Sequence, residues 1–276
     1  MLHMPSPMLL QAADGADPRA EAYIAAVGTF TAARAAIVRK LFADMGAAAD
    51  KLRFLYLCAA HDQSAATRNV MDPANNPLTA ISNYGGDFIR STDRYIQPSQ
   101  QYYAPADESY LIYPTYTYGS RTSGLGGGNL FVGTYLAPRA SATDGTFYFQ
   151  AMFNPPATLF FSNGQQAAKR TQVNWPGQAS VYHGPSASTS AGGFLAVGRS
   201  GANSVGWVDG APADSPQNTG QPTINFGQTG ARGYISASPV LRIAIHCLGE
   251  EMTDAEVATL NTAFRNYLTS IGAPLA

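Results

Sequence analysis

Helical spacing of apolar residues marks the N-terminal third of the chain. Between residues 32 and 45, apolar side chains recur on one face of a helix. These positions are Ile37, Val38, Leu41, Phe42 and Met45. Thr31 is a candidate N-cap and Gly46 a natural stop, so this spacing predicts a helix between them. The Ala-rich region 19–75, which includes the apolar segment 52–57, is expected to be helical and poor in strands.

A second helical pattern closes the chain. Residues 253–256, Thr-Asp-Ala-Glu, form a capping box, and Met252 and Val257 are placed as a hydrophobic staple. One apolar stripe follows, at Val257, Leu260, Phe264, Leu268 and Ile271. Gly272 and Pro274 end the pattern. The sequence therefore predicts a C-terminal helix that packs on the rest of the domain.

Between residues 78 and 247, the apolar residues form short runs rich in aromatic and β-branched side chains, separated by Gly, Pro, Asn and Ser. These runs span residues 110–116, 130–136, 146–153, 158–162, 172–175, 180–183, 194–198 and 241–247. Closely spaced strands with turn residues between them are typical of a sandwich or barrel. In the last run, Leu241, Ile243 and Ile245 face one way while Arg242 and His246 face the other, which predicts a half-buried strand.

The composition agrees with a β-rich globular protein, and the charge balance argues against nucleic acid as a partner. Hydrophobic residues make up 45% of the 276 residues, whereas charged residues make up only 13%, about half the usual share. The 27 glycines and 18 prolines suit many strands joined by turns. The net charge is −1 and no basic run occurs, which argues against nucleic-acid binding.

Four regions are expected along the chain. Residues 1–18 form an arm and linker, 19–75 a helical attachment region, 76–248 a β-sandwich, and 249–276 the packed C-terminal helix. The arm is apolar and broken by prolines, which suits a docking peptide or a frayed end. No apolar stretch is long enough for a membrane helix, and no basic secretory start is present, so a cytosolic origin is expected.

Cys58 and Cys247 lie far apart in sequence, each in an apolar run. The preferred interpretation is two buried small hydrophobes, with a disulfide left open. Neither a metal site nor a cofactor is predicted, because cysteines, histidines and carboxylates do not cluster.

Catalytic patterns are weak in this sequence. The Glu-x-Asp-x-Glu arrangement of glycan-cleaving sandwiches is absent, and no Gly-x-Ser-x-Gly elbow occurs. A Ser-His-Asp arrangement stays open, since His61, His183 and His246 lie in separate regions with many serines around them. Capping accounts for His61 without catalysis. The glycine-rich stretch 119–128 lacks the ending of a P-loop and is expected to be a flexible loop.

Glycan binding is the sharpest functional hypothesis that the residues support. Sugars are held by aromatic faces with amide and carboxylate groups at their edges, on loops of a rigid scaffold. The candidates are Trp175, Tyr182, His183, Asn203, Trp207 and Asp209. Each could instead serve core or hairpin packing. The tyrosines at 102, 103, 113, 116 and 118 are equally suited to subunit contacts.

The order of these segments resembles a recurring arrangement in phage appendages. The lead-in segments are Ala22-Tyr23-Ile24, residues 31–37, residues 51–62 and residues 65–70. Further matches are residues 129–136, Gly198-Arg199-Ser200, Trp207-Val208-Asp209-Gly210, and the closing strand and helix at 241–247 and 252–272. Together they are similar to concanavalin A-like (laminin-G-like) domains of phage tail, tail-fibre or head-fibre and spike proteins.

The resemblance implies a mainly β fold, an antiparallel jelly-roll β-sandwich with an N-terminal helical region and a C-terminal helix. In that family the segment resembling Val208-Asp209-Gly210 is a hairpin. The implied role is a non-enzymatic structural component on the surface of a virion, assembled in the host cytoplasm. Its expected partners are other virion proteins, further copies of itself and host-surface polysaccharide. The alternatives are a carbohydrate-binding module of a non-virion bacterial protein and a polysaccharide depolymerase.

Overall fold

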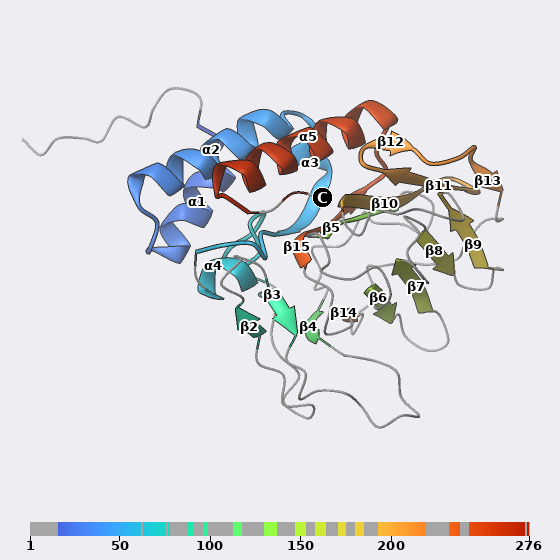
Figure 1. Cartoon of the computed structure of the whole chain (residues 1–276), viewed down its shortest axis with the longest axis horizontal. Helices are drawn as coiled ribbons and strands as arrows, with labels where there is room; N and C mark the ends of the chain where they lie inside the picture. The colour runs from blue at the N-terminus through green and yellow to red at the C-terminus, as the bar shows by residue number, and fades with distance from the viewer. Residues whose placement is uncertain are drawn as a thin grey trace, which may run out of the picture.

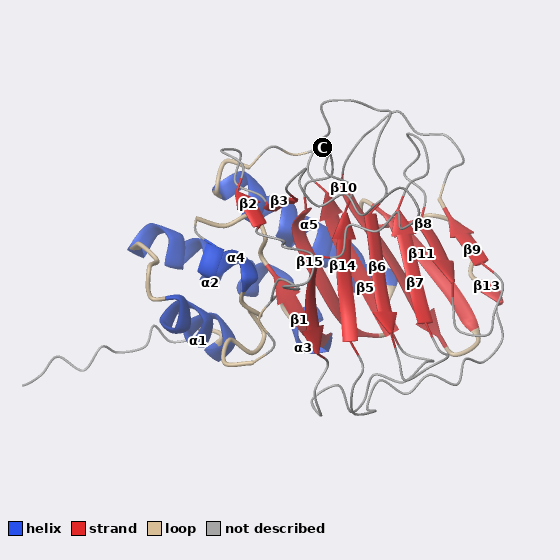
Figure 2. Cartoon of the chain, turned by 90° about the horizontal axis from the view of Figure 1, so that it is seen from below, coloured by secondary structure: helices blue, strands red, loops and turns tan. Residues whose placement is uncertain are grey.

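The computed structural model arranges the chain in three layers: helices, a central sheet and an outer sheet (Figure 1). It describes residues 16–61, 63–75, 77, 88–90, 96–98, 113–117, 130–136, 147–152, 158–163, 171–174, 180–184, 193–218, 232–237, 243–273 and 275. The strand pairs in these residues are antiparallel (Figure 2). The chain is thus an antiparallel jelly-roll β-sandwich with helices at both ends, as predicted.

The central sheet has the strand order β12-β11-β10-β5-β15-β3-β2, with β1 also paired to β15 and β13 to β11. Its strands are β1 (Leu52–Tyr56), β2 (Phe88–Arg90), β3 (Ile96–Pro98), β5 (Leu130–Leu136), β10 (Gly193–Ser200), β11 (Asn203–Val208), β12 (Ala211–Pro212), β13 (Gln217–Asn218) and β15 (Ile243–Glu250).

The outer sheet has the order β4-β14-β6-β7-β8-β9. Its strands are β4 (Tyr113–Thr117), β6 (Phe147–Met152), β7 (Thr158–Asn163), β8 (Thr171–Asn174), β9 (Ser180–His183) and β14 (Arg232–Ala237). Each of the predicted runs overlaps one of the observed strands. The aromatic and β-branched pattern therefore located these strands, whereas β1, β2, β3, β11, β12, β13 and β14 lie outside the runs.

The helices confirm the two strongest local signals. They are α1 (Pro18–Val27), α2 (Ala32–Met45), α3 (Ala48–Lys51), α4 (Gln63–Thr67) and α5 (Asp254–Ser270). Thr31 caps α2, and Thr253 and Glu256 form the full capping box of α5. Helices α2 and α5 lie side by side on the central sheet (Figure 1). The Phe264 ring of α5 meets Phe194 of β10 edge-on, with centroids 5.4 Å apart.

One segment of the N-terminal region departs from the helical prediction. Leu52–Tyr56 is strand β1, which pairs with β15 in the register Leu55 opposite Cys247. A short run that is apolar on both faces has no helical or strand period, and here the bare edge of β15 decides its structure. Strand β1 of the region 19–75 is thus part of the central sheet.

The outer edge of β1 is closed by a side chain. The Asn69 side chain accepts a hydrogen bond from Leu55 N at 3.2 Å and donates one to Arg53 O at 3.5 Å. Val70 N then donates to Leu55 O at 2.8 Å. Asn69, which is fully buried, thus takes the place of a neighbouring strand.

Strand β15 is buried on both faces, which corrects the half-buried prediction. Its residues 244–249 are all buried, because the helices cover one face and the outer sheet the other. His246 faces the outer sheet and hydrogen-bonds Thr134 at 2.9 Å. Cys247 faces the helices, and both cysteines are free and buried, as the preferred interpretation held. Burial raises the pKa of the Cys58 thiol to about 12.

The hairpin implied by the family resemblance is present. β11 and β12 pair through Val208 and Ala211, so Asp209 and Gly210 form a two-residue loop. Their φ angles are 50° and 83°. Two consecutive positive φ values are what a tight hairpin requires, and Asp-Gly is a preferred pair for it.

The burial of His246 predicts a pH dependence of folding. Burial lowers its pKa to about 3, against about 6.5 in an unfolded chain. As pH falls from about 6.5 towards 3, the unfolded state takes up a proton that the native state refuses. Stability should therefore fall by up to about 1.4 kcal/mol per pH unit through this group. Urea denaturation at pH 7.5, 6.5, 5.5 and 4.5 measures the slope.

The control for this prediction is the double variant Thr134→Val/His246→Leu, which removes the titrating group and its hydrogen-bond partner together. Its stability should decline less steeply below pH 6.5 than that of the wild type. Equal slopes would show that His246 is not held neutral in the native state.

Candidate functional site

The two sheets meet at one edge through a buried chain of hydrogen bonds. His183 ends β9, the edge strand of the outer sheet, and points towards β11 of the central sheet. Its Nε2 lies 2.8 Å from Ser204 Oγ on β11, and its Nδ1 lies 2.7 Å from Asp214 Oδ1 in the loop between β12 and β13. Because an ionised carboxylate only accepts, Nδ1 donates to Asp214, and Nε2 forms the second hydrogen bond with the Ser204 hydroxyl.

A glycine makes this contact possible. A Cβ atom at Gly206 would overlap the Cβ of His183. β9 and β11 therefore approach each other more closely than strands of facing sheets usually do. The imidazole lies on the bare backbone of Gly206, between Ser204 and Asp214.

Residues 211–218, here called the edge segment, join both sheets. Its backbone pairs with β11 through β12 and β13, and Ala213 N donates to Gly206 O at 2.8 Å. Its side chains reach β9: Gln217 Nε2 donates to Tyr182 O at 2.8 Å and to Asp214 Oδ2 at 3.2 Å. Gln217 thus closes the outer edge of β9, as Asn69 closes that of β1.

Tyr182 carries the exposed aromatic surface of this edge. Among the large hydrophobic side chains that the structure describes, that of Tyr182 is exposed, with a relative accessibility of 40%. Alternation along β9 explains this, because Val181 and His183 point inward and Tyr182 must point outward. The candidate site is therefore the outer face of β9 at Tyr182, and Gln217, Asp214, His183 and Ser204 hold the strand that carries it.

Of the six residues predicted to contact a glycan, Tyr182 and His183 belong to this edge, with Tyr182 on its surface and His183 buried beneath. Asn203 is exposed on β11, but it faces away from its inward neighbour Ser204 and so does not share the Tyr182 face. Trp175 lies outside the described residues.

Trp207 and Asp209 lie elsewhere, between the central sheet and α5. Trp207 is 3% exposed, and its Nε1 donates to Asp254 Oδ1 at 2.7 Å. Asp209 Oδ1 accepts from Phe194 N at 3.0 Å, and its carbonyl accepts from Asn261 Nδ2 at 2.7 Å. These two residues fasten the hairpin and the helix, and the covered indole has no free face for a sugar.

Sequence reasoning did not single out Asp214, Gln217 or Ser204. A signal for the edge segment exists in Pro212 and Pro216, since prolines in strand-like segments favour sheet edges. Nothing local indicates that Asp214 and Ser204 meet the same histidine, because those bonds span 31 and 21 residues.

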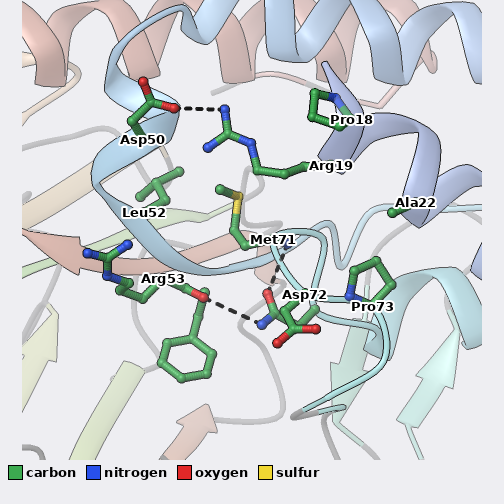
Figure 3. A pocket seen from close by; sticks show the side chains of 11 residues that line it. Pro18, Arg19, Ala22, Asp50, Leu52, Arg53, Met71, Asp72 and Pro73 are labelled. Atoms are coloured by element: carbon green, nitrogen blue, oxygen red, sulfur yellow. Dashed lines mark hydrogen bonds and ion pairs between the residues drawn. The ribbon is translucent and has the colours of Figure 1, made fainter. Parts of the chain in front are cut away.

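A concavity lies near the opposite end of the central sheet, between α1, β1 and residues 69–73 (Figure 3). It is an open groove of about 480 Å³. Its arginines already pair with carboxylates of the chain. Arg19 lies 2.9 Å from Asp50, and Arg53 pairs with Glu250. The predicted glycan-binding residues do not line this groove.

Within the described residues, no three His, Cys, Asp or Glu side chains gather as a metal site. None of the described helices is long and apolar enough to cross a membrane.

Comparisons with known proteins give distant likenesses of fold. No protein-family model and no curated protein matches the chain. A Trypanosoma rangeli sialidase in complex with 2,3-difluorosialic acid aligns over 82% of this chain and 38% of its own, at 9% identity and a TM-score of 0.46.

Two further structures align with lower scores. The binding domain of botulinum neurotoxin DC, in complex with rat synaptotagmin II, aligns over 67% of this chain and 52% of its own, at 10% identity and a TM-score of 0.42. Galectin LEC-6 of Caenorhabditis elegans aligns over 49% and 89%, at 13% identity and a TM-score of 0.32. This chain spans only part of the sialidase and of the toxin domain. The resemblance to phage appendage domains stays a prediction.

The position of Trp207 predicts a role in stability. Trp207→Phe removes a buried hydrogen bond to a carboxylate and leaves a small void, so it should lower the free energy of unfolding by about 2–4 kcal/mol. The matched control, Tyr182→Phe, changes an exposed ring and should stay within about 0.5 kcal/mol of the wild type. Chemical denaturation measures both, and equal stabilities would contradict the role assigned to Trp207.

Proposed function

We propose that this protein is a non-enzymatic, glycan-contacting β-sandwich that serves as a structural component of a phage or phage-like particle. The observation that carries the glycan part is the exposed Tyr182 ring on edge strand β9, whose backbone carbonyl is held by Gln217. An exposed aromatic ring on a rigid scaffold offers a face on which the apolar side of a sugar ring can stack. The resemblance of the sequence to phage appendage domains supports the particle setting.

The rigidity of this edge favours binding. The backbone of Tyr182 is tied to the edge segment through Gln217, and its neighbour His183 is tied to Ser204 and Asp214. A site whose groups are already ordered loses less entropy when a ligand arrives. The backbone that carries the Tyr182 ring is thus held in place before a sugar binds.

The arrangement of Ser204, His183 and Asp214 supports a role without catalysis. In a serine hydrolase the serine faces the substrate and the carboxylate is buried behind the histidine. Here Ser204 is 0% exposed and His183 is 1% exposed, while the Asp214 side chain is 30% exposed. The order of exposure is reversed, so a substrate carbonyl has no path to the serine hydroxyl.

Glycoside cleavage by two carboxylates is also poorly supported. That chemistry needs a pair of carboxyl groups about 5 to 10 Å apart across the glycosidic bond. The edge segment carries one carboxylate, Asp214, and that group is engaged by His183 and Gln217. The depolymerase alternative therefore ranks below binding alone.

The particle role adds three expectations: a location on the virion surface, contacts with other virion proteins, and assembly into a homo-oligomer. A carbohydrate-binding module of a non-virion bacterial protein is the main alternative, and it would use the same Tyr182 edge. The genes that flank this one distinguish the two, because capsid and tail genes favour the particle.

A glycan array of bacterial surface polysaccharides tests the binding role. The wild type should bind at least one of them, and Tyr182→Ala should weaken that binding by about 10-fold, since stacking on one aromatic ring contributes about 1–2 kcal/mol. Tyr182→Trp, which keeps an aromatic face, is the matched control and should retain it.

The same polysaccharides, incubated with the protein, should release no reducing ends. Release of reducing ends would favour the depolymerase. Binding that does not depend on residue 182 would place the glycan site elsewhere on the chain.

The homo-oligomer expected of a fibre or spike component is tested by light scattering after size-exclusion chromatography. At micromolar concentration the measured mass should be at least twice the chain mass of 29.1 kDa, and a whole multiple of it. A stable monomer would count against the particle role and would leave the glycan-binding module as the better description.

A further inference from the structure

The groove between α1, β1 and residues 69–73 has apolar side chains on its floor and around its rim (Figure 3). Leu52 and Phe54 of β1 are each 2% exposed and form the floor. The more exposed side chains around them are those of Pro18, Ala22, Met71 and Pro73. An apolar segment that covered this rim would be stabilised there, because it would remove apolar surface from water.

The arginines of the groove already have carboxylate partners. Arg19 donates to the two carboxylate oxygens of Asp17 at 3.0 and 2.6 Å, and it lies 2.9 Å from Asp50. Arg53 pairs with Glu250. An anionic ligand would have to displace these partners, whereas an apolar segment would leave them in place. The groove therefore favours an uncharged, apolar occupant.

The sequence that precedes α1 contains such a segment. Residues 1–13 include no carboxylate, lysine or arginine, and six of the first ten residues are Met or Leu. After Pro5 and Pro7 comes the apolar run 8–10, Met-Leu-Leu. Methionine suits an irregular groove because its unbranched side chain adapts its shape. We propose that the run 8–10 docks in the groove of its own chain, an inference that does not depend on the glycan site.

Arg19 fixes the point at which the chain enters α1. Asp17 is the N-cap of this helix, and its carboxylate is held by the Arg19 guanidinium. The same guanidinium donates to Ala49 O at 3.1 Å and pairs with Asp50, which lines the groove. Residues 1–16 are therefore attached to the described structure at the rim of the groove.

The tether between the run and the groove is short. The eight-residue step from Leu10 to Pro18 reaches up to about 26 Å when extended. Gly15, within this step, permits the chain to reverse its direction. A flexible tether of this length gives an effective concentration of about 1 mM. A run that bound with a Kd of about 100 µM as a free peptide would then occupy the groove for about nine-tenths of the time.

Methyl NMR of the whole chain tests the contact directly. With the methionine and leucine methyl groups labelled with ¹³C, the Met71 methyl group should show nuclear Overhauser effects to methyl groups of Leu9 or Leu10. Deletion of residues 2–10 should shift the Met71 signal, because its neighbours are removed. The signals of Met45 and Met252, which do not line the groove, are the internal controls and should stay in place.

Two exposed alanines of α1 provide matched variants of the groove. Ala22 lines it, whereas Ala26, one turn further along the helix, does not. Ala22→Glu places a charge on the apolar rim and should release the run, and Ala26→Glu should leave it docked. Because thermolysin cleaves beside leucine only while the run is free, cleavage at Leu9 and Leu10 should be about 10-fold faster in Ala22→Glu and unchanged in Ala26→Glu. Equal thermal midpoints of the two variants would show that both remain folded.

A mixture of labelled and unlabelled chains identifies the molecule that supplies the run. Overhauser effects within the labelled chain alone support docking in the same chain. Effects that arise only between a labelled and an unlabelled chain would place the run in the groove of a second copy and overturn the proposal. It is equally wrong if the deletion leaves the Met71 signal unchanged, or if both glutamate variants are cleaved at the rate of the wild type. None of these readouts involves a sugar, so the glycan proposal is tested separately.

Discussion

The burial of the central sheet on both faces is the constraint on which the rest of the structure depends. Helices α2 and α5 cover one face and the outer sheet covers the other, so every side chain of β5 is buried. A sheet in this position needs apolar side chains on both faces and a partner for each edge. The first need explains why apolar residues predominate in strands β5, β10 and β15. The need for a partner at each edge explains why β1, a segment of the N-terminal region, pairs with β15.

The same constraint sorts the polar residues of the sandwich into two kinds. Two pairs of buried polar residues bond each other between the layers: His246 with Thr134 and His183 with Ser204. Those at the edge face water, as Tyr182 and Asp214 do. A Ser-His-Asp chain can therefore serve structure as well as chemistry, and the depth of each member distinguishes the two. In this hydrogen-bonded series the serine is buried and the carboxylate reaches the surface, which favours recognition over acyl transfer.

Local signals predicted the parts of the fold that depend on neighbouring residues. The capping box at Thr253, the Thr31 cap and the strand-like run at 180–183 can all be seen in a few residues of sequence. The strand at Leu52–Tyr56 could not be distinguished from helix, because an apolar run shows no period when both of its faces are buried. The partners of His183 were hidden for another reason. They depend on how one sheet packs on the other, which no local sequence pattern encodes. Trp207 was predicted to contact a sugar because its sequence neighbours do not show that α5 covers it.

The two amide side chains at the sheet edges have a consequence for how copies of this protein can assemble. Asn69 occupies the outer hydrogen-bonding groups of β1, and Gln217 occupies the Tyr182 carbonyl on β9. At these positions the backbone groups already have hydrogen-bond partners, so a strand of another molecule cannot add to the sheet there. Neighbouring molecules must then meet at these places through side chains. Such contacts choose their partner by shape and chemistry, whereas ladder pairing would accept almost any extended chain.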